Sequence, residues 1–401
     1  MTRNDSFLPY ARQFLDDDDI AAVSDVLRSD FLTTGPAVSA FEDKFAEVTG
    51  APFAVACSSG TAALHLAALA LDLQSSDSVV VPSITFLATA NAARYVGAEV
   101  VFADVDSANG LMQPEHLEQA LEQSEGNIKA VFPVHLGGQS PDMAAIREIA
   151  DRSGLAVVED VCHAIGGTYS SSNREATIGE CAHSDMATFS FHPAKTITMG
   201  EGGAITTWNP ALADRLRLLV NHGMTRDAGE FVEEDMAFDE GGEDNPWYYE
   251  MQDVGFNYRA SDIHCALGLS QLSKLETFVQ HRSVLSDHYD ELLTVLAPVV
   301  RPVSRMPGCK PAWHLYQVLI DFAEAGLSRA EVMRKLRDRG IGTQVHYIPV
   351  HRQPYYRQRN GKIPLPGADA FYAQCLSLPL HVAMTESDVE RVVQELTSVL
   401  A

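Results

Sequence analysis

Between about residues 50 and 207, short apolar runs rich in β-branched residues alternate with helical patterns. The predicted strands are residues 53–57, 78–81, 99–103, 130–133, 156–159, 186–190 and 203–207. The predicted helices between them are residues 61–73, 85–95, 114–123 and 141–152. Several strands are apolar throughout, which is typical of strands covered on both faces. The alternation therefore predicts an α/β domain with a mostly parallel, seven-stranded sheet.

The remainder of the chain predicts a second, smaller α/β unit. Residues 224–253 form a loop rich in acidic residues and glycine, and a helix is predicted from about residue 261 to 297. Beyond it, the pattern predicts a strand at 316–321, a helix at 329–339 and a strand at 342–347. We therefore expect a large domain of residues 1–265 and a small C-terminal domain of residues 266–401, hinged on the long helix.

Composition excludes several kinds of partner. The net charge is −25, which disfavours nucleic acid and anionic membranes, because both bind basic surfaces. No apolar stretch is long enough to span a bilayer, and no signal peptide is recognisable at the N-terminus. The six cysteines are widely spaced without a Cys-x-x-Cys pair, which indicates reduced thiols in a cytoplasmic protein and no metal site.

Lys195 and Asp160 form the most informative pair in the sequence. Lys195 is one of only seven lysines, lies in a polar loop and follows Ser190 by five residues, while Asp160 ends an apolar strand. An enzyme that uses pyridoxal 5′-phosphate (PLP) needs a lysine amine to hold the cofactor aldehyde and an acid to keep the pyridine nitrogen protonated. Alone, Lys195 could be a surface lysine and Asp160 a solvated strand-end cap. Together they indicate a PLP site.

Other residues could complete such a site. Ser59, Gly60 and Thr61 follow a strand and open a helix, where free N–H groups and hydroxyls bind phosphate, although an ordinary N-cap has the same pattern. Phe86 could stack on a pyridine ring, but by spacing alone it is more often a core residue. His163 could hydrogen-bond the phenolic oxygen of the cofactor, or be a satisfied core histidine.

The chain resembles the sugar aminotransferases of the DegT/DnrJ/StrS type, which are fold-type-I PLP enzymes. The resemblance covers nearly the whole chain and depends on a set of motifs in order. These are residues 31–36, 59–61, 158–160, 190–195 with 200–203, 255–259 and 345–349. Each motif is weak alone, and the set is specific.

The resemblance implies a role for each matching residue. Lys195 would hold the cofactor and carry the proton between substrate and cofactor, and Asp160 would pair with the pyridine nitrogen. His163 stands where many relatives carry glutamine, at the phenolic oxygen. Phe86 would stack on the ring. The phosphate would be held by Ser59, Gly60, Thr61 and Ser190, and by Asn257 of a second subunit, which makes the active site a property of a homodimer.

A sub-branch is also suggested. Residues 191–195, 247–250, 314–316 and 346–351 are similar to the pseudaminic-acid branch of the family. The resemblance then implies transfer of the amino group of L-glutamate to C4 of UDP-2-acetamido-2,6-dideoxy-β-L-arabino-hex-4-ulose. The product would be UDP-4-amino-4,6-dideoxy-N-acetyl-β-L-altrosamine. The candidates for binding substrate are Tyr10, Thr34, Arg259, Tyr316, His346 and His351. Each of them could instead make a structural contact.

Other functions compete with this interpretation. The acceptor could be another nucleotide-linked 4-keto sugar, such as a GDP-perosamine or UDP-bacillosamine precursor. A PLP-dependent sugar dehydratase would carry histidine in place of Lys195. A sensor that binds a sugar nucleotide without turnover would not need Lys195, Asp160 and Ser190 together. A Rossmann dehydrogenase is disfavoured because no Gly-x-Gly-x-x-Gly opens a helix.

Overall fold

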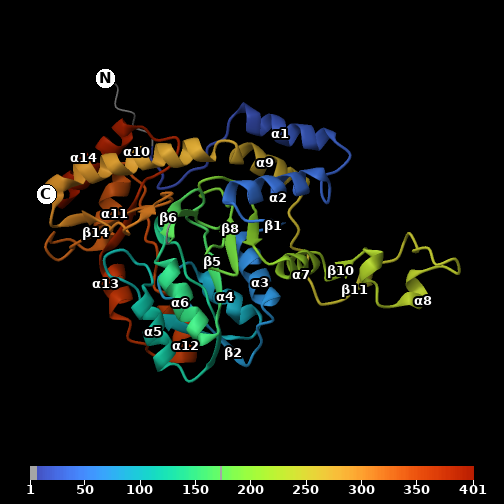
Figure 1. Cartoon of the computed structure of the whole chain (residues 1–401). Helices are drawn as coiled ribbons and strands as arrows, with labels where there is room; N and C mark the ends of the chain where they lie inside the picture. The colour runs from blue at the N-terminus through green and yellow to red at the C-terminus, as the bar shows by residue number, and fades with distance from the viewer. Residues whose placement is uncertain (1–6, 172–173) are drawn as a thin grey trace.

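The computed structural model describes residues 7–171 and 174–401, and a seven-stranded sheet lies at its centre (Figure 1). The strand order is β1-β9-β8-β5-β4-β2-β3. The strands are β1 (Phe53–Cys57), β2 (Asp77–Pro82), β3 (Glu99–Ala103), β4 (Asn127–Val131), β5 (Ala156–Asp160), β8 (Met186–Ser190) and β9 (Gly203–Thr207). Only β9 runs antiparallel to its neighbours, β1 and β8. The predicted α/β fold with a mostly parallel seven-stranded sheet is confirmed.

Helices cover both faces of this sheet. One face carries α3 (Gly60–Ala70), α4 (Leu87–Tyr95) and α7 (Pro210–Val220); the other carries α2 (Pro36–Thr49), α5 (Pro114–Gln123) and α6 (Met143–Ser153). Successive strand residues point to opposite faces, so Val79 and Val81 pack in the first core and Val80 in the second. All three valines are fully buried, which is why this strand is apolar throughout.

The long helix predicted for residues 261–297 is wrong, because two helices occupy this region. They are α9 (Asp262–Leu272) and α10 (Leu275–Leu293). Lys274 lies at the junction, and its amine contacts Asp19 at 2.9 Å on α1 (Asp17–Arg28). The side-chain amide of Gln271 also donates to Asp19, at 2.8 Å. The junction is thus fixed by a helix near the N-terminus, a partner that local periodicity does not reveal.

The C-terminal region has a core of its own. A three-stranded antiparallel sheet of β12 (Val300–Pro302), β14 (Tyr316–Ile320) and β15 (Cys375–Leu378) packs with α10, α11 (Arg329–Asp338) and α14 (Glu386–Leu400). The strand predicted at residues 342–347 is wrong. Among the described residues, this segment makes one bridge, between Gln344 and Ser377, and forms no strand. The N-terminal segment joins the same region, since Leu8 pairs with Ile341 and accepts from the Gly342 N–H at 2.7 Å.

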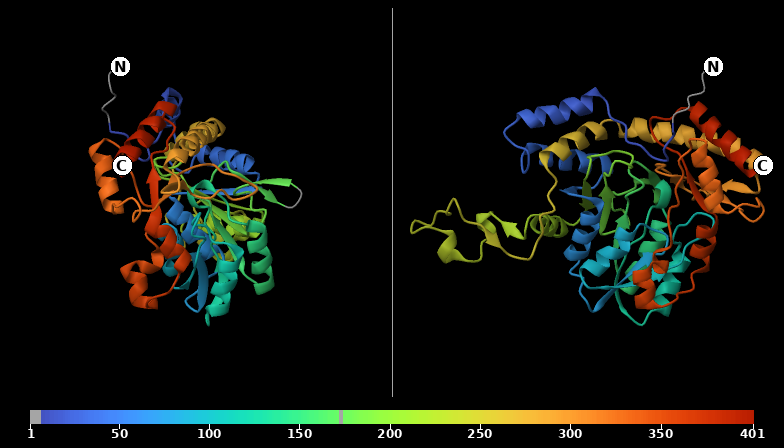
Figure 2. Two further views of the ribbon diagram at one scale, coloured as in Figure 1. Left: turned by 90° about the vertical axis from the view of Figure 1, so that its left-hand side faces the viewer. Right: turned by 180° about the vertical axis from the view of Figure 1, so that it is seen from behind.

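An arm formed by residues 224–254 projects away from the rest of the molecule (Figures 1 and 2). It contains the short pair β10 (Met224–Thr225) and β11 (Glu250–Met251) and the single-turn helix α8 (Glu234–Ala237). Several large apolar side chains of the arm are more than 60% exposed in the single chain. They are Val232, Met236, Trp247, Met251 and Val254.

None of the helices formed by the described residues combines the length and the apolar character that a membrane crossing requires.

Candidate active site

A cavity of about 580 Å³ lies at the carboxyl ends of the parallel strands, where β5 and β8 end and α3 begins. Ligands of α/β sheets collect at this edge. Ten of the residues selected from the sequence line the cavity: Tyr10, Ser59, Gly60, Thr61, Phe86, Asp160, His163, Ser190, Lys195 and His346. The cavity combines residues of the large sheet with the segment around residue 346, which comes from the C-terminal part of the chain.

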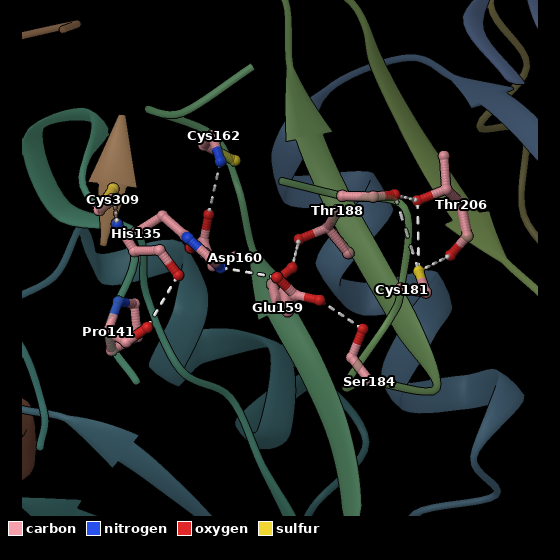
Figure 3. A network of polar contacts seen from close by, with 12 residues as sticks. His135, Pro141, Glu159, Asp160, Cys162, Cys181, Ser184, Thr188, Thr206 and Cys309 are labelled. Carbon is pink, nitrogen blue, oxygen red and sulfur yellow. Dashed lines mark hydrogen bonds and ion pairs between the residues drawn. The ribbon is translucent and has the colours of Figure 1, made fainter. Parts of the chain in front are cut away.

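Asp160 is held firmly at the end of β5 (Figure 3). It is 5% exposed, and its carboxylate accepts hydrogen bonds from Thr89 Oγ1 at 2.7 Å and from the Cys162 N–H at 3.1 Å. Its neighbour Glu159 points to the other side of the strand, where it contacts His135 Nε2 at 2.8 Å and accepts from Ser184 Oγ at 2.5 Å. The alternation of a strand thus leaves Asp160 facing the cavity and Glu159 in the core.

Lys195 follows β8 in a tight turn, in which its N–H donates to the His192 carbonyl at 2.8 Å. Burial lowers the pKa of its amine from the ordinary value, while Cys162 and Asp160 act in the opposite direction. A lowered pKa increases the neutral fraction of the amine near neutral pH, and the neutral amine is the nucleophilic form. Lys195 is therefore suited to attack a carbonyl group.

The start of α3 and the end of β8 approach one another very closely at Gly60. A Cβ atom at this position would lie 2.6 Å from Ser190 Cβ, so only glycine fits. The hydroxyl of Ser59 caps the helix by accepting from the Ala62 N–H at 3.1 Å. Both the N-cap and the anion-site interpretations of this segment are therefore compatible with the structure. The free N–H groups of the first turn, with Thr61 and Ser190 beside them, form a cradle suited to a phosphate.

His163 lies in a cluster of buried rings on one side of the cavity. Its Nε2 atom is 3.0 Å from the Tyr347 hydroxyl, and its Nδ1 atom accepts from the Gly137 N–H at 3.3 Å. The His314 ring lies 4.5 Å away, centre to centre. Burial holds the pKa of both His163 and His314 well below the ordinary value, so both rings are neutral.

Five residues selected from the sequence do not line this cavity. Tyr316 is buried in the C-terminal core, where it stacks on Tyr289 and its hydroxyl donates to Asp290 Oδ1 at 2.6 Å. His351 is buried and contacts Ser83 Oγ at 2.6 Å. The other three are Arg259, which donates to Asn221 Oδ1 at 2.6 Å, and the exposed residues Thr34 and Asn257.

Sequence reasoning did not select Tyr347, His314 and Thr89, although all three contact selected residues. Tyr347 and His314 stand within the motifs on which the resemblance depends, but nothing local links either of them to His163. Thr89 follows a different strand from Asp160, and only the order of β2, β4 and β5 brings the two together. An acid at a strand end could have prompted a search for a hydroxyl partner. It could not have shown where in the sequence that partner lies.

These groups fit PLP. Asp160 would be a fixed acid for the pyridine nitrogen, Lys195 would be the amine for the aldehyde, and the cradle at Gly60, where a Cβ atom does not fit, would take the phosphate. Phe86 offers a flat apolar face, being 54% exposed although it lines the cavity. When bound, PLP supplies an electron sink for charge that develops on a substrate carbon.

Comparison with known proteins agrees with this fit. The chain matches the DegT/DnrJ/EryC1/StrS aminotransferase family over residues 13–397. It is 37% identical to the spore coat polysaccharide biosynthesis protein SpsC of Bacillus subtilis (strain 168), covering 99% of this chain and 98% of that protein.

Two solved structures are similar throughout. The first is Helicobacter pylori PseC, an aminotransferase involved in the biosynthesis of pseudoaminic acid, with a TM-score of 0.87 and 27% identity over 98% of this chain and 99% of that one. The second is the PLP form of the putative sugar aminotransferase Spr1654 of Streptococcus pneumoniae. Its TM-score is 0.85 and its identity 26%, over 98% of both chains.

Proposed function

Because the chain belongs to the DegT/DnrJ/EryC1/StrS aminotransferase family, whose cofactor is PLP, we propose that it aminates C4 of a UDP-linked 4-keto-6-deoxy-N-acetylhexose. The amino donor is L-glutamate, and the sugar is UDP-2-acetamido-2,6-dideoxy-β-L-arabino-hex-4-ulose, a precursor of pseudaminic acid. The observation that carries this choice is the likeness to PseC over almost the whole of both chains.

Lys195 performs the proton transfers in this proposal. Its amine takes a proton from Cα of glutamate in the first half of the reaction and returns one to C4 of the sugar in the second. Burial lowers its pKa, so the same nitrogen can accept and release a proton near neutral pH.

Asp160 and the phosphate cradle orient the cofactor. The Asp160 carboxylate, fixed by Thr89, would pair with the pyridine nitrogen of bound PLP and stabilise a proton on it. Gly60, Thr61 and Ser190 would hold the phosphate, with Ser59 capping the helix. Phe86 would stack on the ring.

Tyr10 and His346 are the substrate-binding candidates that face the cavity. The His346 Nδ1 atom is 2.8 Å from Ser377 Oγ, which fixes the ring. We treat residues 1–265 and 266–401 as two domains. His346 then contacts the sugar from the small domain while Lys195 acts from the large one. Thr34, Arg259, Tyr316 and His351 do not line this cavity.

We propose that the protein is a homodimer with shared active sites, located in the cytoplasm. Asn257 does not line the cavity of its own chain and is exposed, as expected of a residue that reaches the phosphate of a partner. The apolar side chains exposed on the arm, such as Trp247 and Val232, favour burial against a second copy.

A second candidate is an aminotransferase for another nucleotide-linked 4-keto sugar, such as a GDP-perosamine or UDP-bacillosamine precursor. It is favoured by the 37% identity to a protein named for spore coat polysaccharide biosynthesis. Both candidate functions use the same residues to hold the cofactor. They differ only in which sugar the pocket accepts.

The test uses protein treated with excess glutamate and desalted, so that it holds the amino form of the cofactor. Addition of the L-arabino 4-keto sugar should restore the visible absorbance, and its D-xylo isomer should not. Restoration by the D-xylo sugar alone would favour the second candidate. No restoration by either sugar, after a clear reaction with glutamate, would rule out these two UDP sugars as acceptors and leave the transaminase chemistry intact.

A further inference from the structure

The Tyr347 hydroxyl has one partner among the described residues, and that partner is His163 Nε2 at 3.0 Å. The two rings are nearly parallel, at 25°, with their centres 5.9 Å apart. The Phe86 ring lies 6.1 Å from the Tyr347 ring, and all three side chains line the cavity. Tyr347 therefore faces the space that a cofactor ring would occupy.

The direction of this hydrogen bond follows from the other side of the imidazole. The Gly137 N–H donates to His163 Nδ1, so Nδ1 carries no hydrogen. Burial, together with the charge of Lys195, keeps the pKa of His163 well below the ordinary value, and the ring is neutral. The single ring hydrogen is then on Nε2, and Nε2–H donates to the Tyr347 oxygen. The phenolic hydrogen of Tyr347 is left free to donate into the cavity.

Tyr347 stays protonated while its hydroxyl donates into the cavity. Burial raises the pKa of its hydroxyl well above the ordinary value, and the negative charge of Asp160 acts in the same direction. The titratable groups that face it are Tyr10, Asp160, Cys162, His163 and His346. Since the carboxylate among them opposes ionisation, the hydroxyl is a permanent donor for an anionic oxygen.

In PLP the phenolic oxygen sits on the ring carbon next to the one that bears the aldehyde. With the pyridine nitrogen at Asp160 and the aldehyde carbon at Lys195, this oxygen lies on the edge of the ring toward His163 and Tyr347. We infer that Tyr347 donates the hydrogen bond to the phenolic oxygen of bound PLP, and that His163 is a positioning residue that holds the tyrosine. The inference rests on the cofactor site proposed above and is independent of the sugar.

The consequence is measurable without turnover. A hydrogen bond to the phenolic oxygen stabilises its negative charge and so lowers the proton affinity of the Lys195 nitrogen bonded to the cofactor. Removing the donor should raise the pH at which the visible band of the bound cofactor changes from the protonated to the unprotonated form.

The experiment is a pH titration of the absorbance of PLP-loaded protein without substrate. Tyr347→Phe keeps the ring, and its midpoint should rise by about one pH unit. His163→Gln should shift the midpoint in the same direction, and the double variant should shift it no further than Tyr347→Phe alone, as expected of residues that act in series. Tyr355→Phe, an exposed tyrosine outside the cavity, should leave the midpoint unchanged.

An unchanged midpoint in folded, loaded Tyr347→Phe protein, with a shift in His163→Gln, would overturn the inference and make His163 the direct donor. Either of two other results would overturn the cofactor site itself. One is wild-type protein that binds no PLP, and the other is a Lys195→Ala variant that keeps the visible band. Circular dichroism establishes that each variant is folded.

Discussion

Gly60 lies so close to Ser190 that a Cβ atom at residue 60 would stand 2.6 Å from the serine Cβ atom. The two residues are 130 positions apart in the sequence and belong to the first turn of α3 and the last position of β8. Their contact sets the width of the phosphate cradle, because neither element can move without disturbing the packing of the sheet.

Gly60→Ala is therefore expected to weaken PLP binding. The added methyl group forces the start of α3 away from β8, at an overpacking cost of about 1–3 kcal/mol. We expect the dissociation constant of PLP, measured by absorbance titration of the apoprotein, to rise by about 10-fold or more. Gly229→Ala is the control, since only the Asp227 carboxylate lies near that position, at 3.3 Å. Equal affinity in both variants would contradict the assignment of the cradle.

Lys195→Ala should give a folded protein without the yellow colour of bound PLP. The substitution removes the only lysine amine among the described residues that line the cavity, and transaminase activity should fall by about 1000-fold or more. Lys362→Ala is a matched control, because Lys362 is exposed and does not line the cavity. Colour and activity retained in the Lys195→Ala variant would remove the basis for the proposed mechanism.

Mixed subunits test whether Asn257 acts across a dimer interface. Lys195→Ala and Asn257→Ala subunits should each be inactive or weakly active alone. Subunit exchange in the mixture produces heterodimers with one undamaged site. The mixture should then recover up to about a quarter of wild-type activity, because half of the dimers are mixed and each has one good site. If Asn257 serves its own chain, both sites of a heterodimer are damaged and no activity returns.

Acid sensitivity should be reduced by His346→Asn. Burial and the Lys195 charge lower the pKa of His346 to about 3 in the folded protein. Between pH 6.5 and that value the unfolded chain binds a proton that the folded chain does not, so stability falls as the pH is lowered through this window. Between pH 7.5 and 5.0, the free energy of unfolding, measured with urea, should fall by about 2 kcal/mol less in the variant than in wild type.

His222→Asn is the control for this measurement. His222 is exposed and has a left-handed φ of 61°, a conformation that asparagine tolerates. The His222→Asn variant should lose as much free energy of unfolding as wild type between pH 7.5 and pH 5.0. A His346→Asn variant with wild-type acid sensitivity would mean that His346 is not kept neutral by burial.

The strands of the large sheet could be predicted from the sequence because each is nearly apolar, and because helices separate the first five of them from one another. The bounds of β1, β3, β8 and β9 agree with the predicted ones. The break between α9 and α10 could not be predicted, since it depends on Asp19, more than 250 residues away. Likewise, residues 342–347 have the composition of a strand, but among the described residues they pair with β15 only at Gln344 and Ser377.

Residues selected because they follow strands line the cavity, whereas Thr34, Arg259, Tyr316 and His351, selected through the resemblance, do not. Asp160, Ser59 and Lys195 come to the same edge because parallel strands end together. Tyr316 alternates with Gln317 along β14, and its side chain enters the C-terminal core. Sequence order does not reveal which face of a small antiparallel sheet is buried. The Tyr347–His163 contact was also missed, because it joins two regions that are 184 residues apart in the sequence.

The pairing of Leu8 with residues 340–342 also has a consequence for biosynthesis. On the ribosome the N-terminal segment is made first, but the segment with which it pairs appears more than 330 residues later. At about 5–20 residues per second, roughly 15–70 s separate the two events. During that interval Tyr10 has no fixed place, and His346 and Tyr347 do not yet exist. The nascent chain can form the sheet that bears Asp160 and Lys195, but the cavity is enclosed only after translation is nearly complete.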